Sequence, residues 1–341
     1  MAATINDVAK MAGVSITTVS RVLNNNYPVK EQTRQKINDA IGKLNYKPNI
    51  AARSLITKKT FMLGVLVPGI TNLFFPTIVE TIEQTVKKYG YSISLCNTGG
   101  DFESEKVFID EMISRQFDGI IAIDPTIENL NSGCFDDYSK ATPLIVVNGF
   151  PQGNNCNFIC YDETSGTKEA FKYLIGLGHE KIAFLRGHRS FSYDLKEKIY
   201  KDIIKKEGLT YEKVIDAGMG NSIEVVERVN VLLMDLFRYG DIPTAIFACN
   251  DLMALGAINA CSNIGLKIPK DMSIIGFDNT LLSQITSPSI TSVDQNMEEV
   301  GRMSAERIVD MIDKGIREYK VSTLATKLII RESTRECNRS L

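Results

Sequence analysis

The chain has 341 residues, of which 44% are hydrophobic, and its formal net charge is −2. Two or three domains with buried cores fit this length, and the absence of an apolar run approaching eighteen residues argues against a membrane-spanning helix. The charge is uneven, because residues 1–60 hold ten Lys or Arg against three Asp or Glu, a balance of +7 that leaves −9 for the remainder. A basic N-terminal segment on an acidic body is typical of a protein whose one end meets phosphate.

The seven cysteines and two histidines lack the spacing of a metal site or of a C-x-x-C pair. We therefore expect reduced thiols, no metal and no cofactor. No charged segment followed by an apolar one opens the chain, so no secretory signal is indicated. These features predict a cytoplasmic protein without a membrane partner.

Two short helices separated by a tight turn are the first expected elements. Thr4 and Asp7 have the spacing of a capping box, and the apolar positions that follow end at Gly13. Ser15 can cap the second helix through its side-chain oxygen. A helix, a glycine turn and a second helix within about twenty residues are the layout of a DNA-reading helix-turn-helix.

The second helix is expected to have a packing face and an exposed face. Val19, Val22 and Leu23 gather on one side at helical spacing. Thr17 and Arg21 lie four residues apart on roughly the opposite side and project together into solvent. The pattern therefore predicts that these two side chains can read base edges.

Two further helices complete the expected N-terminal domain. The third covers residues 31–44, where apolar residues at spacings of four and three close a three-helix core. Asn49 can cap a fourth helix at residues 50–57, which is too short to be stable alone. We expect this hinge helix to form with a partner or on DNA.

The N-terminal motifs continue collinearly through these helices. Residues 7–24 read D-V-A-x-x-A-G-V-S-x-x-T-V-S-R-V-L-N, followed by T-R-x-K-I at 33–37, L-N-Y-K-P-N at 44–49 and A-R-S-L at 52–55. This segment resembles the headpiece of the lactose-repressor (LacI/GalR) family. The resemblance implies that two hinge helices pair across a dimer in the minor groove, where Leu55 wedges between base pairs.

The resemblance and the helix pattern together assign the residues that contact DNA. Thr17 and Arg21 would read the major groove, and an arginine is best suited to guanine O6 and N7. Ile16 would add an apolar contact, although it also lies near the face of Leu23, so a core role stays open. The remaining expected contacts, mostly with phosphate, are Thr4, Ser15, Thr18, Ser20, Asn24, Tyr46, Asn49, Ala52, Arg53 and Leu55.

From Phe61 the pattern changes to apolar runs alternating with amphipathic stretches of helical length. The expected strands are 63–67, 92–95, 119–123, 144–147, 158–160, 182–185, 245–248 and 273–276. The expected helices are 78–89, 104–115, 166–177, 195–206, 224–239 and 252–264, with a helix near 297–312 and a strand near 324–330 in the tail. Such units predict an α/β fold with two doubly wound lobes of parallel sheet, which by the resemblance are similar to a periplasmic sugar-binding protein.

The expected domains follow from this change of pattern. Residues 1–60 would form the headpiece and hinge helix, and residues 61–341 the effector-binding and dimerisation core. Within the core, we expect an N-lobe at about 61–161 and 291–322. The C-lobe would take about 162–290 and 323–336, because the family's tail segments cross back to complete each lobe.

Polar residues directly after the apolar runs are the candidates for ligand binding, because open parallel sheets bind ligands at the carboxyl ends of their strands. The family signatures there are N-x-F-F at 72–75, L-G-H-x-x-I-A at 177–183, P-T-A-I-F-x-x-N-D-x-M-A-L-G at 243–256 and I-G-F-D-N at 275–279. By resemblance, the effector-binding residues are Asn72, Phe74, Phe75, Asn148, Asn250, Asp278 and Gln295. Asn148 stands where many members carry Asp. Helix capping or turn roles stay open for Asp162, His179 and Asp251.

The stretch 187–197 departs from the family, whose members usually place an arginine about ten residues after the glycine. Lys196 is the nearest cation, and an ammonium cannot reproduce the bidentate fork of a guanidinium. Arg189 could substitute, or the effector could differ. Alternatively, Lys196 could lie on a solvated helix face.

The sequence therefore predicts a homodimeric transcriptional regulator, most simply a repressor, that binds a roughly palindromic operator in double-stranded DNA. A small molecule, a sugar or sugar derivative, would control it by preferring one arrangement of the lobes. An enzyme is disfavoured because no nucleophile-elbow, P-loop, zincin or dinucleotide motif is found. An alternative is a catabolite-control regulator with a serine-phosphorylated carrier protein as corepressor. No leucine heptads follow residue 330, which favours a dimer over a tetramer.

Overall fold

The computed structural model describes residues 3–24, 27–47, 59–149, 156–188, 190–316 and 318–337. The expected hinge helix with Asn49, Ala52, Arg53 and Leu55 lies outside the described residues, as do Arg189 and the side chain of Asn24. The chain divides into two compact units, Met1–Thr60 and Phe61–Leu341. No helix in the described ranges is long and apolar enough to cross a bilayer.

The first unit holds the three expected helices, α1 (Ile5–Ala12), α2 (Ile16–Asn24) and α3 (Glu31–Leu44). The capping box at Thr4 and Asp7 is present, because the Thr4 N–H donates to the Asp7 carboxylate at 2.9 Å and the Thr4 hydroxyl accepts from the Asp7 N–H. Gly13 ends α1 with a φ of 67°, a left-handed conformation that glycine adopts without strain. Val8, Val19 and Ile37 are fully buried at the centre, so one apolar side chain from each helix fixes the unit.

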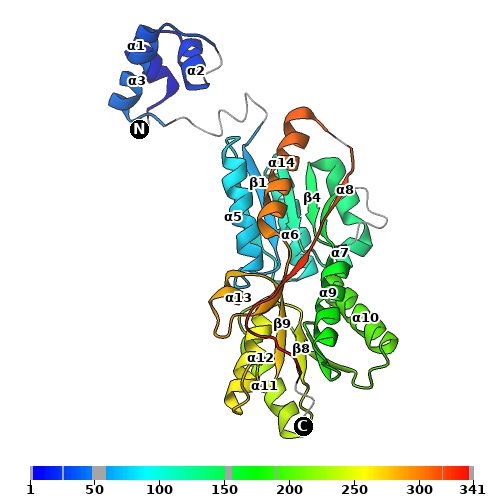
Figure 1. The fold of residues 1–341 in the computed structure, drawn as a ribbon. Helices are drawn as coiled ribbons and strands as arrows, with labels where there is room; N and C mark the ends of the chain where they lie inside the picture. Colours follow the sequence, from blue (N-terminus) through cyan, green and yellow to red (C-terminus); the bar gives the residue numbers. More distant parts are fainter. Residues whose placement is uncertain are drawn as a thin grey trace. The chain divides into compact units, whose positions relative to one another are not determined.

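The second unit contains two six-stranded sheets (Figure 1). The first has the order β11-β5-β4-β3-β1-β2 and the second β12-β10-β9-β8-β6-β7. Neighbouring strands are parallel except β10 and β12. The strands are β1 (Met62–Val67), β2 (Ser92–Asn97), β3 (Gly119–Ile123), β4 (Leu144–Val147), β5 (Asn157–Tyr161), β6 (Ile182–Arg186), β7 (Lys213–Asp216), β8 (Ala245–Ala248), β9 (Ser273–Asp278), β10 (Thr291–Asp294), β11 (Val321–Leu324) and β12 (Lys327–Ile329).

Helices cover these sheets and bury their apolar faces. The helices are α5 (Phe74–Lys87), α6 (Phe102–Ser114), α7 (Ile127–Ser132), α8 (Cys134–Ala141), α9 (Glu163–Gly176), α10 (Phe191–Lys206), α11 (Val225–Arg238), α12 (Asp251–Asn263), α13 (Leu281–Ile285) and α14 (Met297–Lys314). In Figure 1 the orange α14 lies beside the cyan α5 on the first sheet, and α11 lies beside α12 on the second. We call the two sheets with their helices the first and second lobes.

The two-lobed α/β architecture is confirmed, but the expected division of the tail is wrong at one strand. We expected residues 291–322 in the first lobe, whereas β10 pairs in parallel with β9 and places Val293 in the core of the second lobe. Only α14 and β11 return to the first lobe, where β11 pairs with β5. The single strand expected at 324–330 is two strands, because the chain leaves β11 at Leu324 and joins the second sheet as β12.

Helix beginnings also differ from expectation near the site. Helix α5 begins at Phe74 rather than Ile78, and α10 begins at Phe191 rather than Leu195. Their first turns carry polar and aromatic residues that weaken the apolar periodicity. The expectation missed α7, α8, α13 and β7, which are short. The side chains in the first turns of α5 and α10 consequently face the carboxyl ends of the sheets.

Candidate functional site

The exposed face of α2 is the candidate DNA-binding surface of the first unit. Thr17 and Arg21 are exposed, while Val19 and Val22 on the opposite face are buried. Ile16 is 48% exposed, so it lies outside the headpiece core. An apolar, a hydroxyl and a guanidinium side chain are therefore all exposed on this one helix.

Hydrogen bonds at the start of α2 set the position of this face. The Ser15 hydroxyl accepts from the Thr18 N–H at 3.2 Å and lies 2.9 Å from the Thr18 hydroxyl. These two side chains therefore form the helix cap as well as being candidate phosphate ligands. Tyr46 is half-buried against the headpiece core, and Ser20 is half-buried on α2.

Arg21 has an aromatic neighbour that the sequence analysis did not identify. Its guanidinium carbon lies 5.1 Å from the centroid of the Tyr27 ring, a cation–π distance, and Tyr27 is 64% exposed. The contact restricts a flexible side chain on the exposed face of α2. Tyr27 lies in the loop before α3, where helical periodicity carries no signal.

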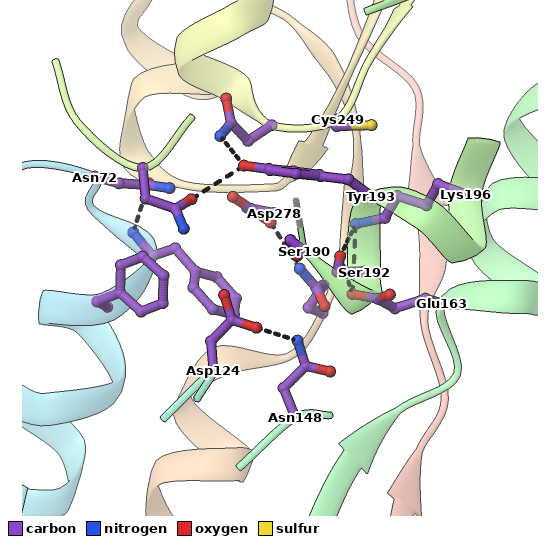
Figure 2. A pocket seen from close by; sticks show the side chains of 15 residues that line it. Asn72, Asp124, Asn148, Glu163, Ser190, Ser192, Tyr193, Lys196, Cys249 and Asp278 are labelled. Atoms are coloured by element: carbon purple, nitrogen blue, oxygen red, sulfur yellow. Dashed lines mark hydrogen bonds and ion pairs between the residues drawn. The ribbon is translucent and has the colours of Figure 1, made fainter. Parts of the chain in front are cut away.

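A pocket between the lobes is the second candidate site (Figure 2). It lies at the carboxyl ends of the strands, and its cavity is about 30 Å³ in this arrangement of the lobes. All of the expected effector-binding residues that the structure describes line it, together with seven more. The lining residues are Asn72, Phe74, Phe75, Asp124, Asn148, Glu163, Ser190, Ser192, Tyr193, Lys196, Asn221, Cys249, Asn250, Asp278 and Gln295.

The first lobe contributes an aromatic wall beside two polar groups. The Asn72 side-chain oxygen accepts from the Phe74 N–H at 3.1 Å, which fixes the first turn of α5. Phe74 and Phe75 are buried and meet edge to face with ring centroids 5.1 Å apart. Asn148 has a φ of 64° and donates its amide to Asp124 at 3.1 Å.

Asp124 was missed by the sequence analysis, although it directly follows β3 and so meets the rule that identified the other candidates. Burial and, to a smaller extent, the nearby Glu163 carboxylate raise the pKa of the Asp124 carboxyl to about 7. The Asn148 amide and the Lys196 ammonium act in the opposite direction. Asp124 can therefore accept or donate a hydrogen bond near neutral pH.

The second lobe contributes two polar residues that have different structural roles. Asn250 caps α12, since its side-chain oxygen accepts from the Met253 N–H and its amide donates to the Gly220 carbonyl, both at 2.9 Å. Asp278, at the end of β9, accepts from the Gln295 amide at 2.6 Å. Burial, with the nearby Asp251 carboxylate, holds the pKa of Asp278 well above its usual range.

Lys196 is 1% exposed, so the alternative that it lies on a solvated helix face is wrong. Its ammonium donates to the Ser192 hydroxyl at 2.6 Å and to the Glu163 carboxylate at 3.4 Å, as Figure 2 shows. It also lies 3.8 Å from the centroid of the Phe277 ring. Glu163, at the start of α9, was missed because its role comes from its contact with Lys196, which no periodicity in the sequence indicates.

The three residues for which structural roles stayed open all take such roles. Asp162 caps α9 by accepting from the Ser165 N–H at 3.0 Å. Asp251 accepts from the Thr280 N–H and the Ser292 hydroxyl, both at 2.7 Å, and so joins α12 to the segment after β9 and to β10. His179 lies 3.0 Å from the Ser273 hydroxyl, and burial lowers its pKa.

Comparisons of the sequence with protein families match both units. The family described as bacterial regulatory proteins, lacI family, matches residues 4–49, and the periplasmic binding protein-like domain matches residues 171–334. The HTH-type transcriptional repressor PurR of Vibrio atlanticus (strain LGP32) is 33% identical over 98% of this chain and 100% of its own length. Catabolite control protein A of Priestia megaterium is 34% identical over 98% of this chain and 100% of its own length.

Solved structures match the fold over both units. The lac repressor dimer bound to operator and the anti-inducer ONPF matches with a TM-score of 0.85 and 26% identity, covering 98% of this chain and 100% of that chain. A LacI family transcriptional regulator from Enterococcus faecium with bound ribose matches with a TM-score of 0.71 and 26% identity. That match covers 81% of this chain and 100% of the other.

Proposed function

Because the chain belongs to the lacI family of bacterial regulatory proteins, it is a DNA-binding transcriptional regulator, and we propose that a small molecule in the pocket between its lobes controls repression. The observation that carries the proposal is that both lobes line one pocket. A ligand that contacts both lobes favours one arrangement of them over another. Its effect on DNA affinity then equals the difference in its affinity for the two arrangements.

We propose that α2 reads the operator in the major groove. Thr17 and Arg21 would contact base edges, Ile16 would contact a thymine methyl group, and the hydroxyls of Ser15 and Thr18 would bind phosphate. The exposure of the first three side chains supports these roles. A homodimer presents two such helices, so the operator would be an inverted repeat.

A carbohydrate is the effector class that the relatives favour. Two matched regulators, each 26% identical to this chain, have structures with bound ribose and with D-xylulofuranose. The pocket combines an aromatic wall from Phe74 and Phe75 with carboxyl and amide groups, a mixture that suits a polyhydroxylated ring. The relatives are regulators, and we propose that this chain likewise releases its ligand unchanged.

A phosphorylated carrier protein as corepressor is the second candidate. The 34% identity to catabolite control protein A supports it. The helix that would meet such a partner is α14. On it Arg302 contacts both Glu299 and Glu306, so a phosphoryl group would have to compete with two carboxylates for that guanidinium.

The test is thermal unfolding of the full chain against sugars, sugar phosphates, purines and the phosphorylated carrier protein. A ligand that binds only the folded state raises the unfolding temperature. We expect one small molecule to raise it, and Phe75→Ala to abolish the increase. An increase in unfolding temperature with the carrier protein alone would contradict the proposed role of the pocket and support the protein corepressor.

Selection of bound fragments from random DNA tests the other half of the proposal. We expect the recovered sequences to contain an inverted repeat whose half-sites are spaced by the symmetry of a dimer. A direct repeat or a lone half-site would contradict a symmetric dimer on DNA.

A further inference from the structure

Lys196, the one cationic side chain among the described lining residues, is already paired with groups of the protein. Lys196 has three ammonium hydrogens, of which two are directed to Ser192 and Glu163, while the ring of Phe277 lies against the ammonium at 3.8 Å. The side chain is 1% exposed. Lys196 therefore has little remaining capacity to hold an anionic group of a ligand.

The pocket also contains two hydrogen-bond acceptors that lack donors among the described residues. The Gln295 amide donates to Asp278, but its carbonyl oxygen, on a side chain only 3% exposed, has no partner in the described part of the chain. The second oxygen of Glu163 is likewise buried and without a partner among those residues. Burying a hydrogen-bond acceptor without a donor costs free energy. A bound ligand that donates hydrogen bonds to these two oxygens would remove that cost.

The charge of the lining points in the same direction. Asp124, Glu163 and Asp278 line the pocket, and among the described lining residues the only cationic side chain is that of Lys196. Figure 2 shows Asp124 on the first lobe and Asp278 on the second, on either side of the pocket. Arg186 does not change this balance, because it pairs with Asp194 and Glu197 away from the lining.

We propose that this pocket selects a cationic, amine-bearing polyol, of which an amino sugar is the simplest example, over neutral sugars, and that it rejects phosphorylated or carboxylated ones. The inference rests on the proposed effector site. An ammonium group donates charge-assisted hydrogen bonds to carboxylates and is attracted by aromatic faces such as those of Phe74 and Phe75. An anion would be buried beside these carboxyl groups, and Lys196, the one cation among the described lining residues, is already paired with Glu163.

The test compares sugars that differ in one group. Glucosamine, galactosamine and mannosamine are titrated calorimetrically into the full chain beside glucose, galactose and mannose, with N-acetylglucosamine as an uncharged amide and glucose 6-phosphate as an anion. We expect at least one amine to bind about tenfold or more tightly than its parent sugar, the advantage of a charge-assisted hydrogen bond. The acetylated and phosphorylated sugars should bind more weakly than that amine.

A pair of variants separates charge from shape. Asp278→Asn keeps the size of the side chain but removes the carboxyl group that a bound ammonium would hold in its ionised form, so the preference for the amine over its parent sugar should fall to about twofold or less. Asp235→Asn is the matched control, because Asp235 is exposed on α11 and pairs with Arg238 outside the pocket. This variant should keep the preference of the original chain.

The outcomes separate this inference from the proposed function. If a neutral sugar or the sugar phosphate binds as tightly as every amine, and Asp278→Asn weakens that binding, the amine proposal is overturned while the pocket stands. If no amine binds at millimolar concentration, the amine proposal is overturned. If nothing but the carrier protein stabilises the chain, the pocket fails as the control site as well.

Discussion

The exposed face of α2 and the pocket between the lobes hold their polar side chains in opposite ways. Thr17 and Arg21 project from a helix that is fixed by its other face. Lys196, Asn250 and Asp278 each have a hydrogen-bond partner from a different segment of the chain. Removing an exposed side chain from α2 should therefore weaken DNA recognition alone, whereas removing a pocket side chain should also lower folding stability.

The largest expected effect comes from breaking the buried pair of Lys196 and Glu163. Lys196→Met leaves the Glu163 carboxylate, itself 2% exposed, without its cation. Removing one partner of a buried pair typically costs about 3–5 kcal/mol. We expect the free energy of unfolding of the second unit, measured in urea, to fall by that amount.

Two controls show whether burial of the pair causes the loss of stability in Lys196→Met. Replacing both partners, with Lys196→Met and Glu163→Gln, should recover most of the loss, because no unpaired charge remains. Lys314→Met breaks an exposed pair with Asp310 and should change stability by less than about 0.5 kcal/mol. Equal losses from Lys196→Met and Lys314→Met would remove the contrast between pocket and surface.

The next effect lies on α2 and should appear in recognition. Arg21→Ala is expected to weaken operator binding by roughly 1–3 kcal/mol and to relax the preference at one base pair, with no loss of folding stability. Fluorescence anisotropy on operator and random DNA measures both quantities. Lys36 is an exposed cation on α3, and Lys36→Ala should weaken binding to operator and to random DNA equally. Equal losses on both DNAs from Arg21→Ala would refute its role as a base reader.

The pH dependence of stability sharpens the contrast for Asp124. The folded protein raises its pKa from 3.8 to about 7, so the native state binds the proton more tightly than the unfolded chain. Stability should therefore decrease as pH rises through this window, and the full penalty should be present above it. After allowance for partial solvent exposure, Asp124→Asn should stabilise the protein by about 1–2 kcal/mol near pH 8.

The same variant should give no charge-related gain near pH 4, where the carboxyl is largely protonated in the native state. Urea unfolding at several pH values gives the difference between the two proteins. Asp235→Asn, on the exposed face of α11, should leave the pH profile unchanged. A difference that stays constant from pH 4 to 8 would show that shape or hydrogen bonding, and not charge, causes the effect.

What the sequence predicted correctly was mostly local. Helix periodicity placed Val19 inside and Arg21 outside, because both positions depend on the same nine-residue helix. The strand-end rule assembled Asn148 and Asp278 in one pocket, because parallel strands bring their carboxyl ends to one edge. Glycine and capping residues similarly marked the limits of α1.

What it did not predict depends on contacts between distant residues. The partner of Lys196 is Glu163, 33 positions earlier, and no periodicity links them. Strand β10 was assigned to the wrong lobe because an apolar run does not state which sheet it will join. The contact of Tyr27 with Arg21 joins a loop residue to a helix residue, and helical periodicity carries no signal for such a contact.

The smallest expected effect tests that contact and refines the view of α2 as a surface of independent side chains. Tyr27→Leu removes the aromatic face under Arg21 but keeps an apolar side chain, so the guanidinium loses a cation–π interaction worth about 0.5–1 kcal/mol at an exposed site. If the ring holds Arg21 ready for the groove, operator affinity should fall by about that amount in the original chain and remain unchanged in an Arg21→Ala background. An equal loss in both backgrounds would mean that Tyr27 contacts DNA itself. In that case Arg21 would be as free as Thr17, and the restraint of polar side chains by their neighbours would be a property of the pocket rather than of the DNA-binding face.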